Sequence, residues 1–341
     1  MSGEPVDLAT IETRIGKDLD VMALKETSTD EIAAAAEELR RTAEGLYGSS
    51  DRLFEVAACP CCGAPTADAA IEIRVYGVDY HRCGDCRHCF VRRQPTRAAL
   101  ERRFTEAEEL AETYVDTATL DVRLEQVVRP KLEWTLDVAR THLGRVPRSA
   151  IDVGAGGGHF VRLALDAGID ARGYEISQSS RNFARRTLGV DLRRDFLGEE
   201  PRAELVTFWG LLEYTPDPRA FLRAARAAVE PDGLVVVEVP RIDCLGTAVQ
   251  KSFPDRIARH LDPSSHVNCF SDASLARALA TEGLRPVATW YFGMDAYELA
   301  VQTALATGAP LGGLVEALAP LQRPLDEARF CDDVIVAALP A

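Results

Sequence analysis

Six of the nine cysteines lie between Cys59 and Cys89, and four of them have the spacing of metal ligands. Cys59 and Cys62 form one CxxC pair, Cys83 and Cys86 form a second, and 20 residues separate the pairs. Two such turns converge four thiolates on one ion, which is typical of a closed structural zinc site without an open position for catalysis. We therefore predict that these four cysteines bind Zn²⁺ in a small zinc ribbon.

The neighbouring cysteines leave alternatives open. The run from Cys83 to Cys89 also reads CxxCxxC, so an iron–sulfur cluster or redox chemistry competes with zinc. Four thiolates already satisfy zinc, which leaves Cys61 and Cys89 as core residues or spare thiols. Gly63 and Gly84 lie beside the ligands and suit the tight turns that such a site requires.

A second constellation begins with a glycine-rich loop between an expected strand and helix. The sequence AIDVGAGGGHF places Asp152 just before Gly154, Gly156 and Gly158. Glycines let the backbone approach a ligand, and the following helix offers free N–H groups. The dinucleotide pattern GxGxxG would need glycine where this chain has His159. An acidic residue at the start of the loop favours a ligand with a cationic amine over a phosphate.

Two further acidic positions follow at the ends of the next expected strands. Glu175 comes 21 residues after Gly154, and a carboxylate there can accept hydrogen bonds from both hydroxyls of a ribose. Asp195 and Phe196 follow the third strand, where they offer an acceptor for an exocyclic amine and a ring for an adenine face. Together these residues indicate a nucleoside-like ligand with a charged amine.

In this order and spacing the region resembles the class I S-adenosylmethionine-dependent methyltransferases, over roughly Ser149 to Ala341. The resemblance implies an α/β fold with a doubly wound, seven-stranded Rossmann-like sheet, whose last, antiparallel strand would be DDVIVAALP. It also implies S-adenosylmethionine as cofactor. The cofactor-binding residues expected are Asp152, Gly154, Ala155, Gly156, Gly158, Glu175, Ile176, Asp195 and Phe196.

With the cysteine segment in front of it, the chain is similar to the zinc-containing sugar C-methyltransferases of deoxysugar biosynthesis. Those enzymes carry a tyrosine–histidine–glutamate–histidine run, whereas this chain has Pro263, Ser264, Ser265 and His266. Only the last histidine is kept, so His266 is the candidate general base, with a packing or hydrogen-bonding role as the alternative. Tyr214 is a second candidate, either lining the acceptor pocket or capping a turn.

The pattern of elements divides the chain into a helical region at 1–55, the zinc ribbon at 56–95, a helical connector at 96–148 and the methyltransferase domain with its substrate-facing region at 149–341. Ser28 and Glu31 have capping-box spacing ahead of a helical period, and Pro130 is expected to break the connector. Short apolar strands then alternate with helices from residue 149 onward.

Composition bounds the partners and the location. The 341 residues are 47% hydrophobic and 27% charged, and the net charge of −14 makes dedicated nucleic-acid binding unfavourable. The segment from His81 to Arg103 carries +5, because it contains seven arginines but only one aspartate and one glutamate. An anionic substrate, or pairing with the acidic remainder of the chain, would explain this charge. The chain shows no signal peptide or membrane span, so we expect a cytoplasmic protein with no membrane partner.

The function expected is S-adenosylmethionine-dependent methylation, at carbon or oxygen, of a small biosynthetic intermediate such as a sugar nucleotide or natural-product precursor. Two alternatives stay open: a ribosomal or transfer RNA methyltransferase that grips RNA with its zinc ribbon, and a non-catalytic scaffold that binds the cofactor. The sequence does not decide the oligomeric state.

Overall fold

The computed structural model describes residues 5–25, 28–49, 52–106, 117–199, 201–253 and 260–341. Its central sheet contains eight strands in the order β1-β13-β14-β11-β10-β7-β8-β9. Their bounds are Glu12–Ile15 for β1, Leu284–Phe292 for β13, Asp333–Pro340 for β14, Val229–Pro240 for β11, Ala203–Trp209 for β10, Ser149–Val153 for β7, Asp170–Tyr174 for β8 and Leu192–Arg193 for β9. Only β14 runs antiparallel to its neighbours in this sheet. The seven-stranded sheet with a reversed last strand is confirmed.

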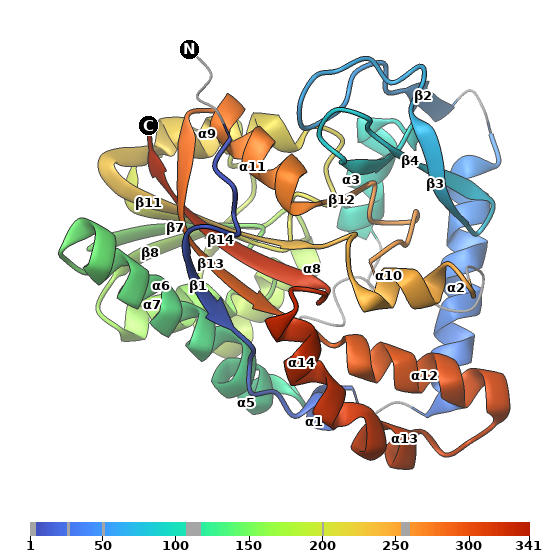
Figure 1. The fold of residues 1–341 in the computed structure, drawn as a ribbon. Coiled ribbons are helices and arrows are strands. Elements are labelled where there is room, and N and C mark those ends of the chain that lie inside the picture. The colour runs from blue at the N-terminus through green and yellow to red at the C-terminus, as the bar shows by residue number, and fades with distance from the viewer. Residues whose placement is uncertain (1–4, 26–27, 50–51, 107–116, 200, 254–259) are drawn as a thin grey trace.

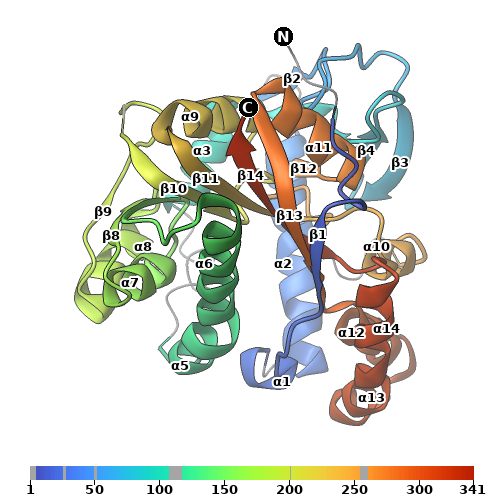
Figure 2. The same ribbon diagram turned by 60° about the vertical axis from the view of Figure 1, so that its left-hand side comes forward.

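The eighth strand is β1, which extends the sheet beyond β13 from a region predicted to be helical (Figure 2). Its four residues, ETRI, are too few and too polar to show the apolar alternation by which a strand is recognised. Because β1 runs parallel to β13, the residues that follow it emerge at the same edge as the ends of β7, β10 and β11.

Helices cover both faces of the sheet (Figure 1). One face packs on α9 (Pro218–Ala228) and α11 (Asp272–Thr281), and the other on α6 (Arg129–Leu143) and α7 (His159–Asp166). Along β11, Val235 and Val237 face the first layer while Leu234 and Val236 face the second. This burial on both sides explains the continuous apolar runs of the central strands.

A smaller sheet carries the cysteine-rich segment. Its order is β12-β5-β4-β3, with bounds Asn268–Cys269, Cys89–Val91, Val78–Arg82 and Ala70–Val75, and a separate ribbon pairs β2 (Leu53–Glu55) with β6 (Arg93–Pro95). The strand β12 comes from the region after residue 149, so a segment from the second half of the chain completes the small sheet. Val56 and Phe90 share the hydrophobic core of the α9 face. The division at 56–95 stays a prediction, but the structure packs this segment tightly against the rest.

The helix predicted after Ser28 is confirmed as α2 (Thr29–Tyr47), with Ser28 and Glu31 forming a complete capping box. Ile32 packs among residues of α12 (Asp295–Thr307), while Ala43 at the other end packs on the small sheet. The Tyr47 hydroxyl donates a hydrogen bond to the Pro263 carbonyl at 2.9 Å. The helix therefore bridges two parts of the fold, as Figure 1 shows at its right-hand side.

In the connector, α3 (Arg97–Glu106) is followed by residues 107–116, which lie outside the described residues, and then by α5 (Leu120–Val122) and a π-helical turn, η2 (Arg123–Val128). The expected break at Pro130 is wrong. Pro130 lies in the first turn of α6, which continues η2 without a gap, so the helix runs through the proline.

The remaining helices are α1 (Val21–Leu24), α8 (Gln178–Phe183), η3 (Ala184–Leu188), α10 (Leu245–Gln250), α13 (Leu311–Leu318), η4 (Ala319–Leu321) and α14 (Gln322–Glu327). Across the described ranges, none of the helices is long and apolar enough to cross a membrane.

Candidate functional site

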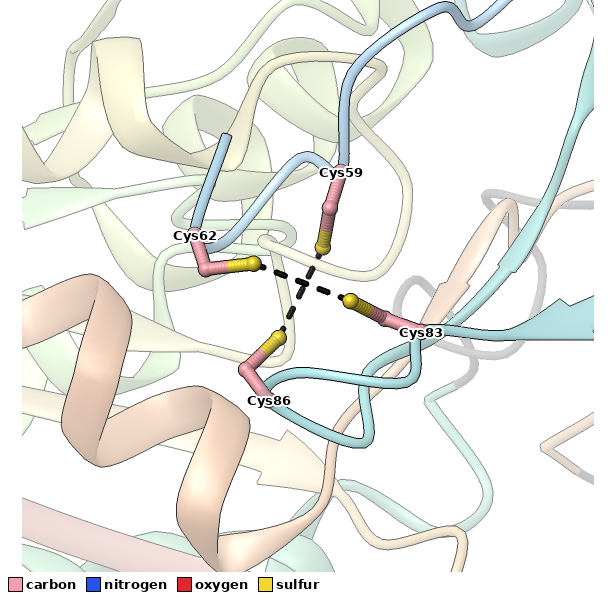
Figure 3. A group of neighbouring side chains, drawn as sticks. All are labelled: Cys59, Cys62, Cys83 and Cys86. Atoms are coloured by element: carbon pink, nitrogen blue, oxygen red, sulfur yellow. Dashed lines mark hydrogen bonds between the residues drawn. The ribbon is translucent and has the colours of Figure 1, made fainter. Parts of the chain in front are cut away.

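The structure brings the four predicted cysteine ligands to one point (Figure 3). Cys59 and Cys62 come from the loop after β2, and Cys83 and Cys86 from the loop between β4 and β5. The Sγ atoms of Cys59 and Cys86 are 3.6 Å apart, those of Cys62 and Cys83 are 3.7 Å apart, and all four lie within 4.8 Å of one another. A tetrahedron with Zn–S bonds of about 2.3 Å has edges of roughly 3.8 Å, so the four sulfurs fit zinc.

These distances exclude disulfides among the four, since an S–S bond is about 2.05 Å long, and all nine cysteines are free thiols. The two turns share one geometry. Gly63 N–H donates to the Cys59 carbonyl and Arg87 N–H to the Cys83 carbonyl, and both residues adopt left-handed backbone, at φ +77° and +62°. Gly84, expected to provide the second tight turn, does not have this conformation, and Arg87 has it instead.

Cys61 and Cys89 are fully buried and stand outside the group of four. Cys61 packs in the core of the α9 face, and Cys89 packs with Tyr80 and Val91 in the core of the small sheet. Their role in this structure is that of small core residues.

The glycine-rich loop runs from the end of β7 into α7. Gly154, Gly156 and Gly158 have φ angles of +74°, +51° and +80°, which residues with a side chain rarely adopt. A Cβ on Gly154 would lie 3.1 Å from Leu211 Cδ1, and one on Gly158 would lie 3.0 Å from the Cβ of Ala184. The loop therefore needs glycine for both its backbone conformation and its close packing.

Two carboxyl groups flank this loop, that of Asp152 buried and that of Glu175 half-buried. Asp152 is 2% exposed, its Oδ1 accepts a hydrogen bond from the Thr207 hydroxyl at 2.7 Å, and burial raises its pKa to about 7. Glu175 accepts from the N–H of Gly156 at 2.9 Å and from that of Ser177 at 2.7 Å, and burial raises its pKa as well. Two acids beside a cradle of glycines can hold a ligand with a cationic group and hydroxyls.

The other predicted cofactor residues lie nearby with differing exposure. Ala155 is 9% exposed within the loop, and the carbonyl of half-buried Ile176 accepts from Arg181. Asp195 is exposed after β9 and accepts from the N–H of Gly198 at 3.1 Å.

Phe196 is 4% exposed, and its ring meets Tyr174 edge-on with 5.4 Å between ring centroids. It packs in the core of the α9 face, so burial accounts for this ring whether or not a ligand also touches it.

The structure also brings the two catalytic candidates together. The rings of Tyr214 and His266 meet edge to face with 4.7 Å between their centroids. His266 is 8% exposed, and its Nδ1 lies 3.0 Å from the His260 carbonyl oxygen. Because a carbonyl oxygen only accepts, Nδ1 is the protonated nitrogen, and in the neutral ring Nε2 carries the lone pair.

Three further ionisable groups at this edge of the sheet were not predicted from the sequence. Glu213, beside Tyr214, is 4% exposed, and burial raises its pKa to about 8. Lys131 on α6 pairs with Glu238 on β11, and both side chains are buried. Their sequence signal is weak, since a lone acid or lysine is usually solvated, and burial follows only from the fold.

Two arginines of the His81–Arg103 segment pair with acidic residues elsewhere in the chain. Arg82 donates to both carboxylate oxygens of Asp243, at 2.7 and 2.8 Å, and Arg92 lies 3.5 Å from Glu55. Pairing with acidic residues elsewhere in the chain thus accounts for part of the +5 charge.

Residues 124–289 match the family described as "Methyltransferase domain". The ubiquinone biosynthesis O-methyltransferase of Bordetella avium is 32% identical over 115 residues, which is 31% of this chain and 46% of that protein. Its counterpart in Methylococcus capsulatus is 29% identical over 106 residues, or 28% of this chain and 45% of the relative. The chain therefore spans about half the length of the curated relatives it matches.

Among solved structures, the magnesium protoporphyrin IX methyltransferase of Synechocystis aligns with 72% of this chain and 100% of its own, at a TM-score of 0.48 and 14% identity.

Proposed function

We propose that this chain, whose residues 124–289 match a methyltransferase domain, is a class I S-adenosylmethionine-dependent methyltransferase that transfers a methyl group from this cofactor to a small-molecule acceptor. One observation carries the proposal: the buried carboxyl group of Asp152 and the half-buried one of Glu175 flank a loop with three left-handed glycines. S-adenosylmethionine has a cationic amine and a ribose diol, and these residues fit both. The cofactor supplies an activated methyl group, so the chain must chiefly align the acceptor and exclude water.

On the acceptor side, His266 is proposed as the base that takes a proton from a hydroxyl or an enolisable carbon through Nε2. The hydrogen bond from Nδ1 to His260 holds the ring in the required tautomer. Tyr214 is proposed to line the acceptor pocket. A crystal structure with S-adenosylhomocysteine tests both roles: Nε2 of His266 on the open side of the sulfur supports them, and a ring turned away from it rejects the base.

The acceptor proposed is an anionic biosynthetic intermediate, a sugar nucleotide or natural-product precursor, methylated at carbon or oxygen. The curated relatives are named as O-methyltransferases of ubiquinone biosynthesis, and this supports a small molecule as the acceptor. The similarity of the cysteine segment and its following domain to sugar C-methyltransferases supports a sugar nucleotide. Arginines of the His81–Arg103 segment would face its negative charge.

We also propose that Cys59, Cys62, Cys83 and Cys86 hold a structural Zn²⁺. The sulfur spacing fits a tetrahedral ion, and four thiolates leave no position for a catalytic water. Nine free thiols and no disulfide fit a reducing compartment, which supports the cytoplasm as location.

Isothermal titration calorimetry with S-adenosylmethionine tests the cofactor assignment. Glu175→Ala removes both acceptors that would hold the ribose hydroxyls, so we expect the dissociation constant to rise at least about tenfold, or ~1.4 kcal/mol. Asp191→Ala, which removes an exposed carboxylate outside the loop, is the matched control and should leave the constant unchanged. Equal affinity of wild type and Glu175→Ala would refute this assignment, and a wild-type protein that binds no cofactor would refute the proposed function.

A further inference from the structure

Two loops that carry the proposed acceptor residues are tied to the cysteine-rich segment. We call residues 211–216, after β10, and residues 262–269 the acceptor loops, since the first contains Tyr214 and the second contains His266. We propose that the four-cysteine module, residues 56–95, positions both loops, chiefly through a buried contact between His88 and Asn268. This inference rests on the proposed function for its meaning, because it explains what the module does for that site.

The contact joins two fully buried side chains. His88 lies two residues after Cys86, and its Nε2 is 2.9 Å from Asn268 Oδ1. The amide nitrogen of Asn268 donates to the carbonyls of Thr215 at 2.6 Å and Leu212 at 3.4 Å. Asn268 Oδ1 must therefore be the acceptor, and His88 Nε2 the donor. One asparagine thus links the module to both acceptor loops.

Backbone hydrogen bonds beside this contact join the same segments, the small sheet and the two acceptor loops. Val91 N–H, on β5, donates to the Val267 carbonyl at 3.0 Å. Val267 and Asn268 in turn donate to the Glu213 carbonyl, at 2.9 and 3.1 Å. These backbone hydrogen bonds join the small sheet to the first acceptor loop through residues 267 and 268, next to His266.

The module also contacts His266 directly. The Tyr80 hydroxyl, on β4, donates to the His266 carbonyl at 2.7 Å and is fully buried. The loop that bears Cys83 and Cys86 fixes His88 in turn, since Cys83 N–H donates to the His88 carbonyl at 2.8 Å. The imidazole is packed between Phe90 and Phe270, with ring centroids 6.0 and 4.8 Å away.

These contacts connect the four-cysteine cluster to the proposed acceptor site, although a closed metal site takes no part in the chemistry itself. An ion bound there orders the turn that carries His88, and His88 orders Asn268. Without the His88 donor, a buried amide oxygen loses its partner, and both loops lose a shared anchor. His88 and Asn268 are thus positioning residues for His266 and Tyr214, and touch no reacting atom themselves.

Hydrogen–deuterium exchange on the full chain, loaded with zinc, tests this positioning role. His88→Leu keeps the volume and removes the donor, and we expect amide exchange to rise at least tenfold in peptides covering both 211–217 and 262–271. Exchange across β7 and α7, residues 149–166, should stay as in the wild type, because His88 contacts neither. His88→Gln restores a donor of similar reach and should return both peptides most of the way.

A second readout follows His266 itself. In protein with ¹³C-labelled histidine, the ring signal of His266 should shift in His88→Leu and return in His88→Gln. A signal and exchange rates unchanged in His88→Leu would overturn the proposal. So would faster exchange confined to residues 78–91 of the module, because His88 would then stabilise only the strands next to it.

Thr66→Val is the matched control, since it removes a different buried hydrogen bond of the module, from the Thr66 hydroxyl to the Val56 carbonyl. It should alter exchange at 56–69 and leave both acceptor loops as they are. Should His88→Leu lose its zinc, Asn268→Ala decides instead, because it leaves the module's residues unchanged. With zinc retained, faster exchange in both loops supports the proposal, and unaltered exchange overturns it. None of these readouts needs an acceptor or cofactor, so failure of the proposed function would show separately, in calorimetry.

Discussion

Cys59→Ser is expected to lose the bound metal and to destabilise the whole chain, not only the cysteine segment. A structural zinc site contributes about 10–16 kcal/mol in small zinc-binding peptides, so loss of one ligand in four should cost roughly 3 kcal/mol or more. Cys59 and Cys86 belong to the same hydrophobic core as the strands of the α9 face, which is why the effect should spread. Metal analysis and thermal unfolding measure the two halves of this prediction.

Cys61→Ala is the control that the chain itself offers. Cys61 is fully buried between two ligands in the sequence, yet its sulfur is outside the cluster. We expect this variant to keep one zinc per chain and to lose only about 1 kcal/mol, as for a small core truncation. Stoichiometric zinc in Cys59→Ser, or a wild type that carries a coloured iron chromophore instead, would contradict the assignment.

Affinity for S-adenosylmethionine is expected to fall steeply as the pH drops below 7. Burial raises the pKa of Asp152 to about 7, so the ligand-free protein holds a proton there that the cationic amine must displace. Below pH 7 the dissociation constant should rise about tenfold per pH unit, reaching roughly a hundredfold at pH 5. Calorimetry in two buffers of different ionisation enthalpy would measure the proton released.

Asp152→Asn should bind weakly with a shallow pH profile, whose remaining slope comes from Glu175 because burial raises that pKa too. Asp170→Asn, at the opposite end of β8, removes an exposed carboxylate and should keep the wild-type profile. A wild-type affinity that does not change between pH 8 and 5 would remove Asp152 from the site.

The same shift has a defined effect on folding. Between about pH 4 and 7 the folded chain keeps a proton on Asp152 that the unfolded chain has released. This group's contribution to the free energy of unfolding therefore falls as the pH rises through that range. Binding of a cation next to the carboxylate offsets that cost.

Local signals in the sequence predicted the features whose causes are local. Backbone conformation requires glycine at 154, 156 and 158, and thiol spacing requires two CxxC turns, so both motifs can be read without a fold. The cap at Ser28 is equally local. Strand–helix alternation predicted the sheet, because burial on both faces leaves apolar runs.

Features that depend on distant partners could not be read in this way. β12 is only two residues long and exists because β5 lies beside it, more than 170 positions away in the sequence. The raised pKa of Glu213 comes from burial, and its sequence neighbours do not show which carboxylates are buried. The left-handed turn fell on Arg87 rather than Gly84, since the position after the second cysteine, and not the residue type, fixes it.

The N-terminal strand has a consequence for how copies of this chain meet one another. Without β1, the nine residues of β13 would offer a row of unpaired N–H and C=O groups at the rim of the sheet. Such a rim is a template for edge-to-edge association. In its place the protein presents a four-residue strand with exposed Glu12 and Arg14, and the Arg14 guanidinium lies 4.1 Å from the centre of the Trp290 ring. This short, charged edge strand therefore disfavours aggregation through the longer apolar strand β13.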